Sequence, residues 1–255
     1  LDFVLAKLNI NHGWKTAMYS PENHPLELHF SKFAEKVIGK RFEGVGRLSK
    51  QELDSMIKYH SNNYFFINPK EDFTLDNILS AVKSLVRKKG VKSFVIDAWN
   101  KLDHQFTGNE NKYISEQLDK LTMFCEKNKV HLFLVAHPTK IQKDKTTGMY
   151  EIPNLYNISG SANFYNKTAN GITVYRNYDE GLTEVHVQKV KFKHWGSVGH
   201  VKLAWNPKNG RYYQGNPDDT NWLANQANSL EQKSLEPSWD FLTEKSDLGI
   251  NEPVN

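Results

Sequence analysis

The sequence has very little cysteine and no long hydrophobic run. Its 255 residues include one cysteine, Cys125, and the mean hydropathy is −0.64. A single cysteine cannot form an internal disulfide or supply a cysteine-based zinc site. No apolar stretch approaches the roughly 20 residues of a membrane-spanning helix, and the N-terminus has no signal-peptide pattern. These absences argue against a disulfide-stabilised secreted domain and a membrane partner, and they predict a cytoplasmic protein.

The charge is distributed unevenly along the chain. The sequence contains 33 basic and 29 acidic residues, giving a formal net charge of +4. Residues 216–255 contain eight acidic and two basic residues, which leaves 31 basic and 21 acidic residues in residues 1–215. A net charge of +10 on the body suggests a polyanionic partner. The alternative is that the asymmetry serves solubility alone.

Helix and strand patterns alternate through the first half of the chain. Helices are predicted where apolar residues recur three or four positions apart, and Ser49 with Glu52 forms a capping box before one of them. Strands are predicted where β-branched and aromatic residues run together. The predicted helices are 1–11, 30–38, 50–57, 75–89 and 114–125, and the predicted strands are 15–20, 64–67, 94–99 and 131–137. This alternation is typical of a mostly parallel sheet with right-handed crossovers.

The pattern changes after this alternation. A polar loop at 138–156 is followed by strands joined by short turns that contain glycine or asparagine. Asn209-Gly210 is a hairpin signal before a short strand at 211–213. The strands before it are predicted at 171–176, 183–193 and 201–206. We expect them to be antiparallel additions at one edge of the parallel sheet.

The end of the chain differs in composition from the rest. Residues 216–255 are rich in Asn, Ser, Glu and Pro and have no sustained periodicity, so we expect an acidic, mostly disordered tail. Within it, Trp222, Trp239 and Phe241 are candidate contact points. The chain is therefore predicted to divide into a domain at 1–215 and a tail at 216–255.

Three polar residues stand where predicted strands of the parallel sheet end. The run Phe94-Val95-Ile96-Asp97-Ala98-Trp99 delivers one carboxylate, Glu22 follows an earlier strand, and His137 ends a later one. Open α/β folds bind ligands at the carboxyl edge of the sheet, and an aspartate there commonly holds Mg²⁺ on a nucleotide phosphate. From the residues alone, Asp97 could equally cap a turn, Glu22 be an exposed turn acid and His137 be structural.

Taken in this order and spacing, these segments resemble the RecA-type motor domain of hexameric replicative DNA helicases. That group includes the bacteriophage primase–helicases, mitochondrial Twinkle and the DnaB family. The resemblance covers residues 1–215 and implies an α/β, RecA-like P-loop NTPase core. Such a core has a mostly parallel twisted sheet, helices on both faces and antiparallel strands added at one edge. The resemblance also implies ATP or another NTP, Mg²⁺, and a bacterial or phage-infected cell.

The resemblance assigns roles to the three strand-end residues. Glu22 matches the glutamate that orients and deprotonates the attacking water, and Asp97 matches the Walker B aspartate that binds Mg²⁺. A carboxylate suits the first role because it can accept a proton from a water held in line with the γ-phosphate. His137, followed by Pro138 as in Twinkle, matches the residue that senses the γ-phosphate and relays its state to the DNA-binding loops.

Two further segments resemble the family's DNA-contacting parts. Ser159, Gly160 and Ser161 open a stretch similar to the one that includes the loop touching single-stranded DNA in the central channel. Small residues there let backbone N–H groups approach phosphate. Three lysines in the preceding loop would add counter-charge, unless that loop is merely solvated. They are Lys140, Lys143 and Lys145.

The family's arginine finger has no exact counterpart. The run Lys191-Phe192-Lys193-His194-Trp195-Gly196 resembles a Lys-x-Arg pattern whose arginine enters the neighbouring subunit's ATP site, a contact worth roughly 10³–10⁵ in rate. Lys193 stands where the arginine is expected, and lysine keeps the charge but loses the bidentate fork. We expect Lys193 to act as a weaker finger, with Lys191 and Arg176 in support.

The phosphate loop of the family is missing. No G-x-x-x-x-G-K-[ST] sequence occurs in the 255 residues, and neither Gly39-Lys40 nor Gly13-Trp14-Lys15-Thr16 has the required upstream glycine and context. In the family this loop opens the helix that residues 1–11 are predicted to finish. We therefore expect the chain to be truncated just after the loop, to come from a parent that can include a primase domain, and to be inactive alone.

Three functional hypotheses follow. The first is an ATP-dependent 5′→3′ DNA helicase motor that forms a ring, expected to be a hexamer, around single-stranded DNA. The second is a non-catalytic RecA-like module for DNA binding or assembly, favoured by the absent phosphate loop and by Lys193, but not by the three strand-end residues. The third is a recombinase-type ATPase, which should lack the His-Pro pair. By analogy with phage helicases, the acidic tail suggests a replicative polymerase as a partner.

Overall fold

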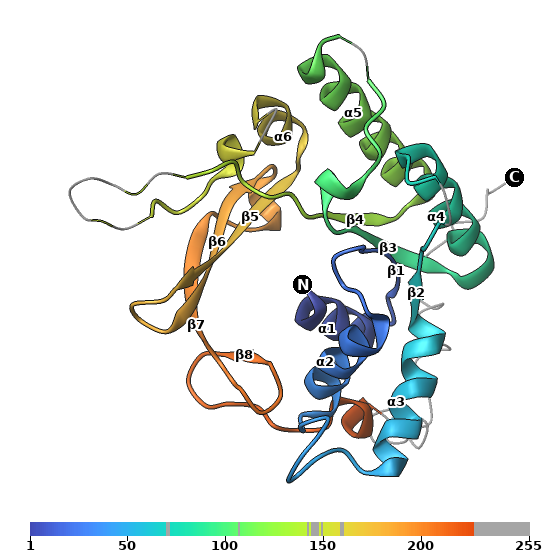
Figure 1. Cartoon of the computed structure of the whole chain (residues 1–255), viewed down its shortest axis with the longest axis vertical. Helices are drawn as coiled ribbons and strands as arrows, with labels where there is room; N and C mark the ends of the chain where they lie inside the picture. The colour runs from blue at the N-terminus through green and yellow to red at the C-terminus, as the bar shows by residue number, and fades with distance from the viewer. Residues whose placement is uncertain are drawn as a thin grey trace, which may run out of the picture.

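The computed structural model describes residues 1–69, 72–106, 108–141, 143, 148, 150–158 and 161–226. Within these ranges the chain forms two sheets, and most of the helices pack around the first (Figure 1). The second sheet follows the first in the sequence. No helix in the described ranges is long and apolar enough to cross a lipid bilayer.

The first sheet has four parallel strands in the spatial order β2-β1-β3-β4. They are β1 (Lys15–Tyr19), β2 (Tyr64–Phe66), β3 (Val91–Ile96) and β4 (His131–Leu134). Five of the six residues of β3 are buried, as expected for a central strand that helices cover on both faces. The predicted parallel sheet is confirmed, and the polar residues that follow the strands lie outside it.

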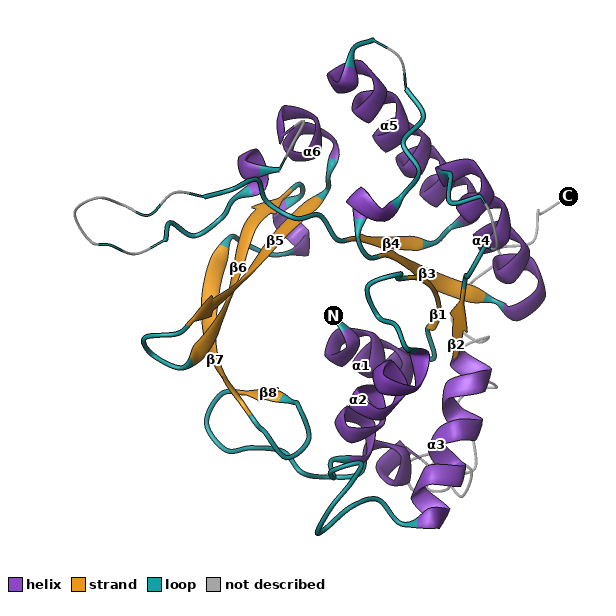
Figure 2. Ribbon diagram, in the orientation of Figure 1, coloured by secondary structure: helices purple, strands orange, loops and turns teal. Residues whose placement is uncertain are grey.

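Helices cover both faces of this sheet, as predicted for a RecA-like core. Met18 and Val95 point into one buried cluster, and Tyr19 and Phe94 point into the other, because neighbouring side chains of a strand face opposite sides. The first cluster packs under α1 (Asp2–His12), α2 (Leu26–Ile38) and α3 (Lys50–Asn63), and the second under α4 (Leu75–Lys89) and α5 (Glu110–Asn128). Figure 2 shows α1 and α2 on one side of the strands and α5 on the other.

The helix starts test the capping predictions. Ser49 Oγ accepts from Glu52 N at 3.2 Å while Ser49 N donates to Glu52 Oε2 at 2.8 Å, so the predicted capping box is present. Thr74 stands at the start of α4 as predicted, but its side chain makes no capping bond. Instead Asp72 Oδ1 accepts a hydrogen bond from Thr74 N at 2.8 Å.

The second sheet is antiparallel, with the spatial order β5-β6-β7-β8. Its strands are β5 (Asn170–Asn177), β6 (Leu182–Val190), β7 (Gly199–Trp205) and β8 (Tyr212–Tyr213). The antiparallel strands are therefore found where predicted, but in the described chain they form a sheet of their own and do not extend the edge at β4.

Two short helices that the sequence analysis did not predict explain this separation. The 3-10 helix η2 (Leu155–Asn157) and the helix α6 (Ser161–Lys167) lie between β4 and β5. Phe164 of α6 is buried in the same cluster as Trp99, with ring centroids 5.7 Å apart. This contact holds α6 against the first part of the molecule, so β5 begins beyond α6 and not beside β4.

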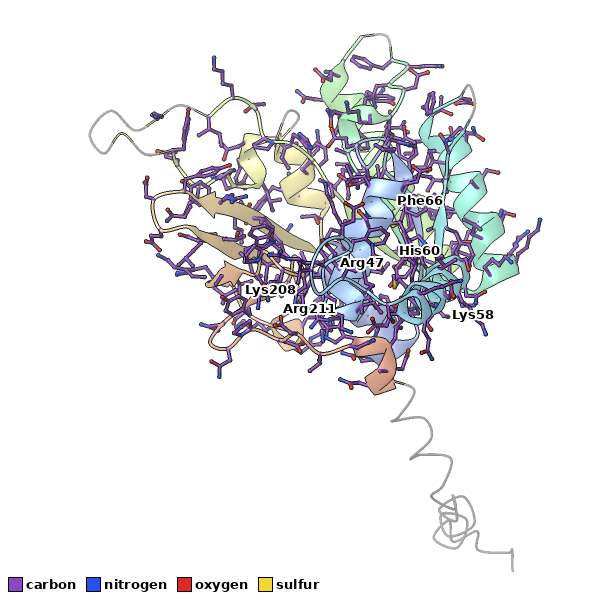
Figure 3. The ribbon with its side chains drawn as sticks, turned by 60° about the horizontal axis from the view of Figure 1, so that its bottom comes forward. Arg47, Lys58, His60, Phe66, Lys208 and Arg211 are labelled. Carbon is purple, nitrogen blue, oxygen red and sulfur yellow. The ribbon has the colours of Figure 1, made fainter. Side chains whose placement is uncertain are left out.

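The end of the second sheet is attached to α2 through a buried arginine. Arg211 is 1% exposed, and its guanidinium donates to the carbonyls of Lys36, Val37, Asp218 and Thr220 at 2.7–3.3 Å. The carbonyls of Lys36 and Val37 belong to the last turn of α2, where a cation is favourable. Figure 3 shows Arg211 where the hairpin meets the helices.

Residues 216–226 are part of this attachment, although the sequence analysis placed them in the tail. Trp222 is 3% exposed, its ring lies 3.9 Å from the Arg211 guanidinium carbon, and its centroid is 5.5 Å from that of Phe3. Trp222 also donates to Asp218 Oδ2 at 2.9 Å. Residues 227–255, with Trp239 and Phe241, lie outside the described residues.

Replacing Arg211 with methionine should lower the free energy of unfolding by about 3 kcal/mol, because four buried carbonyls lose their charged donor. Urea denaturation followed by circular dichroism measures this change. The control is Arg176→Met, at an exposed site, which should change stability by no more than about 0.5 kcal/mol. Equal effects of the two changes would contradict the stabilising role of Arg211.

His60, on α3, lies in an aromatic cluster beneath the first sheet. Its ring stacks on Tyr64 and on Phe66, with centroids 5.3 and 5.8 Å apart, and Figure 3 shows it beside Phe66. Its Nε2 is buried and has no hydrogen-bond partner among the described residues. Burial, with a smaller effect from His29, lowers the pKa of His60 from 6.5 to about 4.

His60 should make the fold acid-sensitive. The folded protein binds a proton at this imidazole less readily than the unfolded chain does, so the stabilisation is complete above about pH 6.5 and is lost as the pH falls towards 4. The loss attributable to His60 should be about 3 kcal/mol. His60→Phe keeps the stacking and should flatten the stability–pH curve in this window, whereas His12→Phe, at an exposed site, should not. Denaturation at a series of pH values checks both.

Candidate active site

Three parallel strands bring three loops to one edge of the first sheet. Tyr19, Ile96 and Leu134 end β1, β3 and β4 and lie in register across the sheet. Glu22 comes three residues after β1, Asp97 directly after β3 and His137 three residues after β4. The parallel register therefore places all three predicted site residues at the same, carboxyl edge.

Asp97 is held in place by the loop that carries Glu22. Its Oδ2 accepts hydrogen bonds from Ser20 Oγ at 2.9 Å and from Asn23 Nδ2 at 3.1 Å, and Asn23 also donates to Ser20 Oγ at 2.7 Å. Its backbone N–H donates to the carbonyl of Tyr19 at 2.9 Å. Oδ1 accepts no hydrogen bond from the described residues, so this carboxylate oxygen is available to a ligand.

The oxygens around Asp97 suit a magnesium ion. A carboxylate beside the Ser20 hydroxyl is a hard-oxygen donor set, which Mg²⁺ prefers, and Mg²⁺ is commonly bound by one or two carboxylates together with substrate phosphates. No group of three or more His, Cys, Asp or Glu side chains in the described ranges is arranged to hold a metal ion alone. A cation here would therefore depend on phosphate oxygens as well as on Asp97.

Glu22 lies between two side chains that can carry positive charge. His137 Nε2 is 3.4 Å from Glu22 Oε2, and Lys101 Nζ is 3.8 Å from Glu22 Oε1. The Glu22 side chain is 33% exposed, so solvent screens both interactions. The contact with His137 confirms that residues 115 positions apart in the sequence meet at one point, which Glu22 can share with a polar or charged ligand.

Lys101 is positioned by a buried tyrosine. It ends the 3-10 helix η1 (Trp99–Lys101), and its carbonyl accepts a hydrogen bond from Tyr19 Oη at 2.7 Å. Burial raises the pKa of Tyr19, so its hydroxyl remains protonated and able to donate. Because Tyr19 ends β1 and Lys101 follows Asp97 by four residues, this bond fixes the Glu22 loop and the Asp97 loop relative to each other.

The edge of the sheet carries a small depression next to these groups. Its volume is about 210 Å³, and its lining includes Ser20, Pro21, Ile67 and Phe73. Enclosed sites for drug-sized ligands are typically ~300–1,000 Å³, so the described chain offers a partial, open site for a ligand of nucleotide size.

Comparison with known proteins decides the family. No family model matches the sequence. A Twinkle homolog protein of Arabidopsis thaliana, named as chloroplastic/mitochondrial, is 36% identical over 227 residues, which are 83% of this chain and 31% of the relative. The solved ATPase domain of a helicase matches the structure with a TM-score of 0.67 at 18% identity, covering 84% of this chain and 80% of that domain. The chain is a RecA-like helicase domain of the Twinkle/DnaB type. It spans about a third of the length of the Arabidopsis relative.

The structure places only part of the predicted DNA-binding set of this Twinkle-type domain. Lys140 and Lys143 are exposed, and the Lys143 ammonium lies 5.1 Å from the Tyr150 ring centroid. Ser161 begins α6. Lys145, Ser159 and Gly160 lie outside the described residues.

The loop after β4 nevertheless returns to the segment before Ser159. Pro138 pairs with Ile158, and Thr139 donates from N and from Oγ1 to the carbonyl of Asn157 at 2.6 and 2.8 Å. The residues directly after His137 and the residues directly before Ser159 therefore lie side by side.

The predicted finger residues lie on the second sheet. Lys191 follows β6, and Lys193 begins the 3-10 helix η3 (Lys193–Trp195). Arg176 pairs with Thr183 near the other end of the β5–β6 hairpin, whereas Lys191 N donates to the carbonyl of Ala169. Seven residues of extended chain separate Ala169 from Arg176, about 23 Å, so the structure does not bring Arg176 together with the two lysines.

Several residues of the Twinkle-type site were missed from the sequence. Ser20 and Asn23 flank Glu22, and Lys101 follows Asp97 closely, so each stood in a loop already singled out. Their roles depend on hydrogen bonds between segments more than 70 residues apart, as between Ser20 and Asp97. A search for polar residues within four positions of a strand-end carboxylate is the signal that finds them.

Replacing Asn23 with alanine should weaken the link between the two loops. The change removes donors to Asp97 Oδ2 and Ser20 Oγ, so we expect the free energy of unfolding to fall by about 1 kcal/mol. Asn68→Ala, at an exposed position beyond β2, should leave stability unchanged within ~0.5 kcal/mol. Chemical denaturation of both variants makes the comparison, and an Asn23 variant as stable as the unaltered chain would show that these bonds contribute little.

Proposed function

We propose that this chain is the core of an ATP-dependent replicative DNA helicase motor that moves 5′→3′ on single-stranded DNA. The observation that carries the proposal is the meeting of Glu22, Asp97 and His137 at one sheet edge, with Glu22 and His137 3.4 Å apart. A base, a cation-binding carboxylate and a polar sensor are the groups that hydrolysis of a nucleoside triphosphate requires. The family relationship supports the same activity.

In this proposal each side chain has a separate task. Asp97, held by Ser20 and Asn23, presents Oδ1 to the metal of a magnesium–nucleotide complex. Mg²⁺ would neutralise charge on the phosphates when bound. Glu22 orients the attacking water and accepts its proton. His137 and Lys101, each beside one oxygen of Glu22, keep the carboxylate in position and offer positive or hydrogen-bonding groups to the γ-phosphate.

The proposed motor needs groups that this chain does not supply. The sequence has no Walker A motif, so the chain alone should bind ATP weakly and should not unwind DNA. We propose that a phosphate loop in a longer parent completes the site. In a ring of such parents, expected to be hexameric, Lys193 would reach the nucleotide of the neighbouring subunit with Lys191 beside it, while Arg176 is too far along β5 to join them.

The remaining partners are proposals from the family. Single-stranded DNA would follow the loop after His137, with Lys140, Lys143 and Lys145 as counter-charges and Ser159, Gly160 and Ser161 close to the backbone. A primase domain and a replicative polymerase are proposed partners of the parent. The cytoplasm of a bacterial or phage-infected cell stays the proposed compartment, although the Arabidopsis relative is named as chloroplastic/mitochondrial.

A non-catalytic RecA-like module that binds DNA or assembles partners is the second candidate. The lack of a Walker A motif and the lysine at position 193 favour it for this chain. The Asp97, Ser20 and Asn23 hydrogen bonds favour the motor, because a module without catalysis gains nothing from holding one carboxylate oxygen and leaving the other available.

The decisive test uses Glu22→Gln in the longer protein that contains a phosphate loop. Glutamine keeps the size of the side chain but cannot accept a proton, so ATP turnover should fall at least ~100-fold while nucleotide binding persists. Turnover is measured by phosphate release and binding by a fluorescent nucleotide. The control is Glu27→Gln, an exposed glutamate on α2, which should leave both unchanged. Parallel loss of binding and turnover at Glu22 would move this residue from chemistry to structure.

A further inference from the structure

Two tyrosines from different elements stack at the junction between the sheets. Tyr156 lies on η2 and Tyr165 on α6, with ring centroids 4.4 Å apart and an interplanar angle of 22°. Tyr156 is 55% exposed, whereas Tyr165 is partly covered. One face of the Tyr156 ring is therefore packed, which leaves a flat aromatic surface towards solvent.

A lysine from the second sheet completes this cluster. Lys189, on β6, lies with its ammonium 4.7 Å from the Tyr165 ring centroid and donates a hydrogen bond to the carbonyl of Tyr165. Burial and the nearby charge of Lys191 lower the pKa of Lys189. No carboxylate of the described residues pairs with Lys189 or Lys191, so the two like charges reinforce each other and attract an anion.

Hydrogen bonds hold this cluster beside the loop proposed to follow DNA. The carbonyl of Asn157 accepts from N and Oγ1 of Thr139, two residues after His137. Gln188 Nε2 donates to the carbonyl of Pro153 at 2.7 Å, which ties the segment before η2 to β6. Tyr156 thus stands three residues before Ser159 on a segment that is fixed on both sides. Figure 2 shows α6 above the ends of β5 and β6.

We infer that Tyr156, backed by Tyr165, is a stacking platform for one unpaired base of single-stranded DNA, with Lys189 neutralising the adjoining phosphate. The inference rests on the proposed function and adds a base contact to the backbone contacts proposed there. Every base has a π-face, so such a contact is independent of sequence. The partner ring of Tyr165 orders Tyr156 before binding, which reduces the entropy lost on association.

The chain offers a matched tyrosine that should not bind DNA. Tyr178 is 80% exposed and lies 5.2 Å from the guanidinium of Arg176, so it also combines an aromatic ring with a cation. It occupies the β5–β6 turn, where the acidic Asp179 and Glu180 follow it and Glu180 pairs with Lys202. Tyr178 therefore tests whether any exposed tyrosine beside a cation has the effect.

The experiment measures binding of the 255-residue chain to a fluorescein-labelled dT20 by anisotropy at several salt concentrations. Tyr156→Leu should weaken binding roughly 5- to 100-fold, whereas Tyr156→Phe, which keeps the ring, and Tyr178→Leu should change it less than about twofold. The slope of binding against salt should be the same for Tyr156→Leu and the unaltered chain, because no phosphate contact is lost. An oligonucleotide of abasic sites should bind the unaltered chain and Tyr156→Leu equally.

A second measurement needs no variant. Irradiation of the unaltered chain with dT20 that carries 5-iodouracil should crosslink the base to Tyr156, as peptide mapping would show. Crosslinks found only elsewhere, or a Tyr156→Leu variant that binds dT20 as the unaltered chain does, would overturn the platform while leaving the proposed motor standing. An equal weakening for dT20 and the abasic strand would overturn it too. A chain that binds neither strand would contradict DNA binding by this domain altogether.

Discussion

The parallel pairing of β1, β3 and β4 is the constraint on which the site depends. Tyr19, Ile96 and Leu134 stand level across the sheet, so the loops after them begin at the same height. Side chains alternate between the two faces of a strand, and a slip of one residue would exchange the two buried clusters. Because Met18 and Tyr19 belong to different clusters, the hydrophobic core fixes the register and thereby the distance between Glu22 and His137.

Much of this arrangement could be read from the sequence because it rests on local signals. Strand-like runs that each end in one polar residue were enough to locate Glu22, Asp97 and His137 at one edge. The capping box of Ser49 was equally local, since both of its partners lie within four residues. A resemblance in the order of segments then identified the family, which the 36% identity to the Arabidopsis Twinkle homolog supports.

The parts that could not be predicted depend on contacts between distant segments. Lys101 carries no motif, and its place beside Glu22 follows from the bond between its carbonyl and Tyr19, 82 positions away. The second sheet separates from the first because Phe164 packs on Trp99, in a helix of seven residues that is too short to show a periodic pattern. Trp222 was noticed as an aromatic residue in a polar stretch, but its burial needs Arg211 and Phe3.

The buried guanidinium of Arg211 has a mechanical consequence. The second sheet is joined to the rest of the molecule at its beginning by α6, through Phe164, and at its end by the bonds from Arg211 to the last turn of α2. A body anchored at two separated points cannot swing about either one as a hinge. Displacement of the β6–β7 turn by a neighbouring molecule would therefore be transmitted as a torque to α2, the helix that follows the loop of the proposed base.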